Sequence, residues 1–478
     1  MGGVLAFFLI LVIAIAFLMF LIIKANMHPV LSLLFVGLFA GIAMGFTPIK
    51  SVKLITEGFG GTLQNVGIPI MLGAVLAMGI RDTGAAKSIA NFFIRLFRGK
   101  NLELAPSLTA YIVSIPVFGD ITTVLTANIA SVLSARKGIS MSTMAAFTEL
   151  GLNLTHAAVP PTPGILAVAL MLGADLGLTI IWGIVVTFIA FLISWLLLKR
   201  WTEKEKIDPI PDFVKGIQRV ESNNIEDLMI KGETLPNAFE SLLPILIPVF
   251  LIATSSLTNI YLPEQNTIRN IFAFLGDKVI AMLLGVIYTM FLGIKYKGSV
   301  ISSNREFSEN NKGNTNPSNS IKDILLNSWI SRGLYIALPA LLITGMGGAF
   351  SNIIKSAPAV EDIASYAVKI PIPHVLIPFF LGVIMMTAVG SMTTAGLTAA
   401  SLVIPMLPAL GLSPVAATLA IGAGTLAINH VNNSGFWVTT QFFHLNTKQG
   451  LKYITVPGIV GALACIAVIL VINVIGLI

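Results

Sequence analysis

The 478-residue sequence is poor in charge and holds a single cysteine. Only 11% of its residues are Asp, Glu, Lys or Arg, whereas a soluble domain carries about 25%. The lone Cys465 excludes an internal disulfide and a cysteine-based zinc site. The sequence has no Gly-x-x-x-x-Gly-Lys-Ser/Thr loop and no His-Glu-x-x-His motif. We therefore expect no ATP-driven chemistry, no enzyme activity and no cofactor.

Long uncharged runs place the chain in a membrane. Hydrophobic residues make up 55% of the sequence, and the mean hydropathy is +0.90. Five runs can each cross a hydrocarbon core of about 30 Å as a helix: 1–23, 176–198, 241–262, 333–354 and 453–478. Residues 370–447 carry no charge and must hold further spans. We predict an all-α polytopic membrane protein with roughly 11–14 crossings, re-entrant hairpins included.

Charge is concentrated in two polar segments. Residues 199–235 and 295–323 together carry 23 of the 51 charged residues. Two predicted spans separate them, so both face one side, and their lysines and arginines place that side in the cytoplasm of a bacterial inner membrane. The net charge of +7 therefore reflects these loops and not a nucleic-acid partner. The Ser/Asn-rich stretch 298–320 is predicted to be disordered.

One motif occurs twice. Residues 117–127 read VFGDITTVLTA and residues 388–399 read AVGSMTTAGLTA. We predict that residues 1–27 form a first membrane span. This segment is not expected to be removed as a signal peptide, because it lacks a basic n-region and a cleavage site. Repeat one then covers 28–200, a cytoplasmic linker 201–235, and repeat two 236–478. The repeats are inverted if each crosses an odd number of times. Paired breaks at matching positions indicate a transporter site at the repeat interface.

Each copy of the motif is predicted to form the tip of a helical hairpin. Hydroxyls and freed amides at a helix N-terminus favour an anion, although a Gly/Thr helix-packing motif is the alternative. A second, histidine-containing break follows each tip, and the first of these includes three prolines that no continuous helix accommodates. A loop at the membrane surface is the alternative for the second break. The predicted substrate-binding residues are Gly119, Asp120, Thr122, Thr123, Asn153, Thr155, His156, Pro161, Thr162, Gly164, Gly390, Ser391, Thr393, Thr394, Asn429, His430, Asn432, Asn433 and Ser434.

Ionisable residues inside a membrane are functional candidates by default. Burial disfavours the charged form of such groups, so Glu149 or Asp120 is expected to carry a coupled proton. His156 and His430 either bind the substrate or donate to a carbonyl and hold a broken helix; both roles stay open. Arg81 and Asp82 are expected to cap a span end and to pair locally.

The sequence resembles the gluconate permease family over nearly its full length. Six marks carry the resemblance, in the order His28-Pro29, Gly58–Leu63, Asp82–Ala86, Thr155-His156 with Pro160–Gly164, Gly390–Ala395 and His430–Trp437. The resemblance implies proton-coupled uptake of small hydroxy-carboxylates such as gluconate. It also implies the ion-transporter superfamily architecture, in which hairpin-bearing transport domains move against a dimeric scaffold, so a homodimer is expected.

The chain departs from the family pattern at several positions. Thr162 replaces a histidine, Ile165 replaces a proline and Asn433 replaces an aspartate, while Glu149 is unusual. A smaller hydroxy acid or another small polar anion therefore fits as well as gluconate. The leading prediction is a proton-coupled symporter for a small organic anion. Sodium coupling is the alternative, because dense carbonyl, Asn, Ser and Thr oxygens suit a hard cation. A passive channel is a further alternative, which substrate accumulation would exclude.

Overall fold

The computed structural model describes residues 2–25, 27–117, 119–215, 217, 219, 225–231, 234–310, 320–358, 371–431 and 433–478, and no strand occurs among them. The first half contains α1 (Gly2–Met19), α2 (Pro29–Ala43), α3 (Pro48–Asp82), α4 (Ala85–Leu96), α5 (Leu104–Val113), α6 (Gly119–Lys137), α7 (Met141–Ala158), α8 (Pro163–Leu172) and α9 (Leu176–Thr202). The second half contains α10 (Ala238–Tyr261), α11 (Thr267–Leu275), α12 (Lys278–Lys295), α13 (Lys297–Asn310), α14 (Ile321–Asp323), α15 (Trp329–Lys355), α17 (Leu376–Val389), α18 (Met392–Val403), α19 (Leu407–Leu410), α20 (Pro414–Leu426), α21 (Ser434–Phe442), α22 (Thr447–Gly450) and α23 (Val456–Val474). Short 3-10 or π segments are η1 (Phe20–Lys24), η2 (Pro211–Val214), η3 (Ile225–Leu228), η4 (Ile324–Ser328) and η5 (Leu451–Thr455).

Seven helical stretches of the described chain are long and apolar enough to cross a membrane. They include α3, α9, α10 and α12, and six shorter apolar helices accompany them. The prediction of a polytopic, all-helical membrane protein is therefore confirmed.

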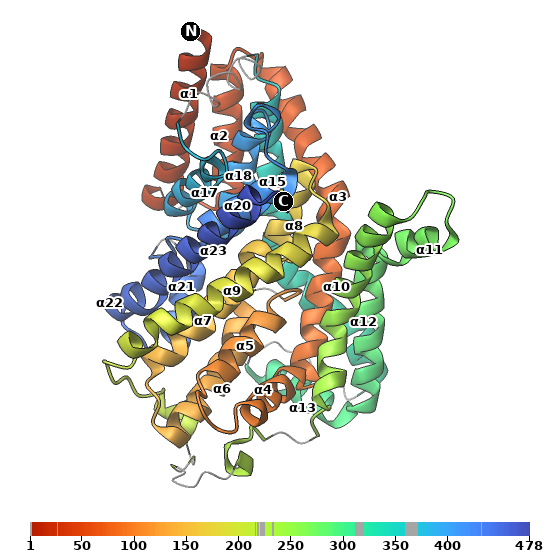
Figure 1. Cartoon of the computed structure of the whole chain (residues 1–478), viewed down its shortest axis with the longest axis vertical. Coiled ribbons are helices and arrows are strands. Elements are labelled where there is room, and N and C mark those ends of the chain that lie inside the picture. The colour runs from red at the N-terminus through yellow and green to blue at the C-terminus, as the bar shows by residue number, and fades with distance from the viewer. Residues whose placement is uncertain are drawn as a thin grey trace.

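The longest helices, α3 and α15, pack tightly against each other. Thr47 caps α3 by accepting from the Lys50 amide (3.2 Å), and Pro48 stands at its first position, where the missing N–H costs nothing. Glycines let the two backbones approach. A Cβ on Gly58 would lie 2.6 Å from the carbonyl oxygen of Gly348. In Figure 1, α10 and α12 lie on one side of α3, and α7, α9 and α23 lie on the other.

Both predicted tips are turns between consecutive helices that contact each other, α5 with α6 and α17 with α18. Gly390 closes the second turn at φ 71°, a conformation that costs glycine little. The predicted proline-rich break lies at 159–162, between α7 and α8. It is shorter than expected, because Asn153, Thr155 and His156 still belong to the last two turns of α7.

The polar linker after α9 and helix α13 lie at the same end of the molecule (Figure 1). That this end faces the cytoplasm stays a prediction. The prediction of disorder over 298–320 is wrong for its first part, because residues 297–310 form α13. Residues 311–319 lie outside the described part of the chain.

The prediction that Arg81 and Asp82 pair locally is also wrong. The buried Asp82 carboxylate pairs with Arg332 of α15 and accepts from Trp329 Nε1 at 2.8 Å. The Arg81 guanidinium instead lies over the ring of Phe307 in α13, 5.2 Å from its centroid. The buried pair thus joins α3 to α15, two helices far apart in the sequence.

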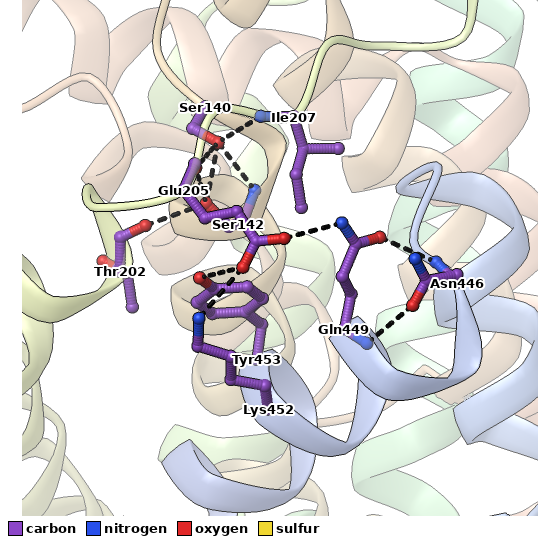
Figure 2. Close-up of polar contacts among 9 residues, drawn as sticks. All are labelled: Ser140, Ser142, Thr202, Glu205, Ile207, Asn446, Gln449, Lys452 and Tyr453. Carbon is purple, nitrogen blue, oxygen red and sulfur yellow. Dashed lines mark hydrogen bonds and ion pairs between the residues drawn. The ribbon is translucent and has the colours of Figure 1, made fainter.

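A carboxylate in the linker joins the two halves at the polar end (Figure 2). Glu205 accepts hydrogen bonds from Gln449 (2.8 Å), Lys452 (2.9 Å) and Tyr453 (2.8 Å). These donors, Gln449 first, hold the pKa of Glu205 well below its usual range, at about 2. The Glu205 backbone carbonyl meanwhile accepts from Ser140, the N-cap of α7 (2.7 Å). The linker is therefore anchored to both α7 and the start of the last span.

Candidate functional site

A cavity of about 160 Å³ is lined by residues from both halves of the chain. The first half contributes the start of α6 and one face of α7; the second contributes the start of α18, the segment after α20 and the start of α21. Its lining residues are Gly119, Asp120, Thr123, Glu149, Leu152, Asn153, His156, Ser391, Met392, Thr393, Asn429, Asn433 and Gly435. The two tips, the last turns of α7 and the break after α20 therefore meet at one place.

Three helix N-termini border this cavity. Helix α6 begins at Gly119, α18 follows its N-cap Ser391, and α21 follows its N-cap Asn433. Asn433 Oδ1 accepts from the Gly435 amide at 2.7 Å, which fixes the start of α21. The N-terminus of a helix carries partial positive charge and unpaired amides. The arrangement therefore favours a negatively charged or strongly dipolar ligand.

Three polar atoms in the cavity wall have no hydrogen-bond partner among the described residues. They are Glu149 Oε2, His156 Nδ1 and Asn429 Oδ1. Glu149 and Asn429 are only 4% and 3% exposed. An unpaired buried polar group costs about 1–3 kcal/mol, and all three atoms belong to residues that line this one cavity. A ligand that hydrogen-bonds them would recover that cost.

The charge of the cavity is unusual for an anion site. Two carboxyls, Asp120 and Glu149, line it, and none of the described lining residues is Lys or Arg. Asn153 Nδ2 donates to Glu149 Oε1 at 3.0 Å from one turn further along α7. Thr123 and Thr439 lie close to the same carboxyl. An anion in this cavity therefore depends on helix termini, amides and hydroxyls, and is repelled by any ionised carboxylate beside it.

Several predicted binding residues support the tips and do not line this cavity. Thr155 Oγ1 donates to the Tyr111 carbonyl (2.8 Å), and Thr162 Oγ1 donates to the Ile115 carbonyl (2.8 Å). His430 Nε2 lies 3.3 Å from the Thr387 carbonyl oxygen, which is the helix-holding role left open for it. The other residues outside the lining are Thr122, Pro161, Gly164, Gly390 and Thr394. Of these, Gly164 lines a smaller adjoining cavity together with His156 and Thr393.

Two predicted residues cannot be placed in this way. Asn432 lies outside the described residues, and Ser434 is described only as the first residue of α21. Leu152, Met392 and Gly435 also line the cavity and were not predicted from the sequence. Leu152 could have been found, because it follows Glu149 by three residues and precedes His156 by four, which places all three on one face of a helix.

A second cavity, of about 270 Å³, lies between α3, α8 and α15. Its polar lining includes Thr62, Asn65 and Asn352, with Glu57 and Lys355 also present. It shares no lining residue with the candidate site. It therefore offers a matched position for control substitutions.

Comparison with known proteins gives a consistent result. The model of the GntP family permeases matches residues 6–311 and 314–475. An uncharacterized permease of Haemophilus influenzae is 30% identical over 458 residues, covering 94% of this chain and 88% of the relative. The high-affinity gluconate transporter of Escherichia coli is 27% identical, covering 95% and 98%, and the D-serine transporter DsdX of the same species is 29% identical, covering 96% of each. The crystal structure of the YdaH transporter of Alcanivorax borkumensis matches with a TM-score of 0.52 at 14% identity, covering 89% of this chain and 90% of that one, which shows a shared fold.

Proposed function

The chain belongs to the GntP permease family, and from that premise we propose that it takes up a small organic acid by proton symport through the cavity between α6, α7, α18 and α21. It is a multi-pass protein of the bacterial inner membrane and a transporter, not an enzyme. Relatives named for gluconate, L-idonate and D-serine support small organic acids as its substrate class.

The cavity with three helix N-termini and three unpaired buried polar atoms is the observation that carries this proposal. The substrate carboxylate rests on the amides and hydroxyls at the starts of α6 and α18. Its hydroxyl or amino groups meet His156, Asn153 and Asn429.

The charge of the site supports proton coupling. An ionised Glu149 or Asp120 repels a carboxylate substrate, and this repulsion weakens binding strongly in a poorly solvated cavity. A proton taken up with the substrate removes that repulsion. Glu149 is the better carrier, because its Oε2 is buried and has no partner among the described residues. The substrate and proton then enter as a neutral pair.

The transport movement is proposed to depend on the two repeats of the chain. We infer that α5–α6 with α7–α8 forms one repeat unit and that α17–α18 with α20–α21 forms its inverted counterpart. These units form a transport domain that moves against a scaffold built on α3 and α15. A homodimer of that scaffold completes the proposal. Two matched broken repeats favour alternating access over a passive pore.

Sodium coupling is the second candidate, and a specific observation favours it. Two of the three unpaired atoms, Glu149 Oε2 and Asn429 Oδ1, are hard oxygen acceptors, the ligands that hard cations prefer. The described residues contain no group of three or more His, Cys, Asp or Glu side chains placed to bind a metal ion. A sodium site here would therefore complete its ligand set with amide, hydroxyl and backbone oxygens beside the Glu149 carboxylate.

Uptake into proteoliposomes tests the proposal. Purified protein is reconstituted, and labelled gluconate, glycerate and D-serine are offered under an inward proton gradient, an inward sodium gradient at fixed pH, or neither. Accumulation above equilibrium that a protonophore abolishes supports proton symport, and accumulation driven only by sodium supports the second candidate. Equilibration without accumulation indicates a channel. If none of the acids enters faster than into protein-free liposomes under any gradient, the proposed function is wrong.

A further inference from the structure

A third cavity, of about 320 Å³, lies at the polar end of the molecule and is strongly basic. Four cationic side chains line it from four separate elements: Arg81 of α3, Lys87 of α4, Arg136 of α6 and Lys231 of the linker. None of its described lining residues is acidic. The helices that form it lie at the end where the linker and α13 are found (Figure 1).

This basic cavity is separate from the candidate transport site, although α6 lines both. Thr123 lines the transport site and Val132 lines the basic cavity. The step of nine positions from Thr123 to Val132 makes about two and a half helical turns. The two cavities therefore lie against opposite faces of α6, so the basic cavity is not an extension of the transport site.

Three of the four cations form no ion pair with a carboxylate of the described chain, although Arg81 also lies over the ring of Phe307. Within the described part of the chain, no carboxylate forms an ion pair with Arg81, Lys87 or Lys231. Arg136 Nη1 donates to the Met229 carbonyl at 2.9 Å, which holds its guanidinium in place, and Asp227 offsets part of its charge. Arg136 and Arg81 are partly buried, whereas Lys87 and Lys231 are exposed at the rim.

Apart from Asn128, the remainder of the cavity wall is apolar. Leu125, Ile129 and Val132 of α6 line it together with Ile217 and Ile230 of the linker. A cluster of cations above an apolar wall, beside the predicted cytoplasmic surface, matches the chemistry of a phosphate group attached to an apolar body. Arginine in particular binds phosphate oxygens through paired donors.

We propose that this basic cavity binds a phosphate group, carried either by an anionic phospholipid of the surrounding leaflet or by a soluble phosphate compound. The bound phosphate joins the α3–α4 turn, α6 and the linker. It thereby holds the face of α6 opposite to the transport site.

Native mass spectrometry of the purified full chain in detergent tests this site. The probes are phosphatidylglycerol, which is anionic, and phosphatidylcholine, which is zwitterionic; in parallel, thermal unfolding is followed with inorganic phosphate as the soluble probe. The test variant is Lys87→Gln/Lys231→Gln. The matched control is Lys204→Gln/Lys206→Gln, which removes two exposed lysines from the same linker end but outside the cavity. All four positions are exposed, so both variants should unfold at the wild-type temperature without ligand.

The expected result is preferential binding of phosphatidylglycerol that weakens about tenfold or more in the test variant, because two charge-assisted contacts are lost. Binding by the control variant stays within about twofold of wild type. If inorganic phosphate, and not the lipid, shows this pattern, the site serves a soluble phosphate. The proposal is overturned if wild type binds neither phosphatidylglycerol nor inorganic phosphate, or if the test and control variants lose equal affinity. It does not depend on which solute the protein transports.

Discussion

Replacing Glu149 by glutamine changes the candidate transport site by one ionisable group while almost preserving its shape. Asn153 Nδ2 can still donate to the side-chain oxygen that now accepts at 3.0 Å. The second oxygen, Oε2, has no partner among the described residues, so its replacement by an amide breaks no described hydrogen bond. The Glu149→Gln variant is therefore expected to fold, with stability within about 1 kcal/mol of wild type.

The size of the effect follows from one carboxyl carrying one proton. A proton entering down a gradient of one pH unit supplies about 1.4 kcal/mol, which concentrates the substrate about tenfold. With a neutral glutamine in place of Glu149, no proton is carried. The accumulation ratio should fall from about ten to about one. Exchange of labelled for unlabelled substrate needs no net proton movement and should continue.

Both quantities are measured in the same proteoliposomes, as gradient-driven accumulation and as counterflow at equal pH. Glu57→Gln is the control, because Glu57 is an acid that lines the second cavity and should leave coupling unchanged. Asp120→Asn tests the other carboxyl of the site. If Glu149→Gln still accumulates substrate about tenfold under the proton gradient, Glu149 is not the proton carrier.

Three further predictions concern stability, each measured by thermal unfolding of the purified protein. Glu205→Gln should cost about 1 kcal/mol at neutral pH, given the partial exposure of this side chain. Because the folded-state pKa of Glu205 is lowered to about 2, this difference should persist above about pH 4.5 and vanish as the pH falls toward 2. Gly424→Ala should destabilise by about 1–3 kcal/mol, because its Cβ would lie 2.2 Å from the Phe379 carbonyl oxygen. Asp82→Asn should cost about 3 kcal/mol or more, because it leaves the buried Arg332 without a counter-charge.

Each of these variants has a clear contrary outcome. If the stability difference between Glu205→Gln and wild type did not shrink in acid, the charge of Glu205 would not be what stabilises the network in Figure 2. Gly60→Ala is the control for Gly424→Ala, because a Cβ at Gly60 meets nothing within 4 Å; it should be neutral or stabilising. Equal effects at both glycines would contradict the close approach of α17 and α20. An Asp82→Asn protein as stable as wild type would show that the buried pair contributes no net stability.

The sequence predicted the lining of the candidate site better than the residues that support it. Gly119, Ser391 and Asn433 each stand at the start of a helix, and Gly or Asn beside hydroxyl residues in an apolar run indicates such a start. The doubling of the motif then indicated that the starts meet. What the sequence could not give is the direction of each side chain. Thr155 and Thr162 look equivalent to Thr123 in the sequence, yet both donate to backbone carbonyls at the end of α5 and in the turn that follows it.

Long-range pairs were beyond prediction for a different reason. Asp82 has a basic neighbour in Arg81, so local pairing was the simpler expectation. In the structure its partner is Arg332, 250 residues away. Likewise, the polar composition of 298–320 hid the helix α13, whose Phe307 lies over both Arg81 and Arg332. Such contacts depend on how α3 and α15 pack, which local pattern does not specify.

The central claim is that the cavity between α6, α7, α18 and α21 holds the transported acid, and cysteine protection tests it most directly. Cys465 is the sole cysteine, so Ser391→Cys in a Cys465→Ala background carries one reactive thiol at the cavity wall. Asn65→Cys in the same background is the control in the second cavity. We predict that a transported acid slows maleimide labelling at position 391 in proportion to site occupancy and leaves position 65 unchanged. Labelling at position 391 that a saturating transported acid does not slow would contradict the account.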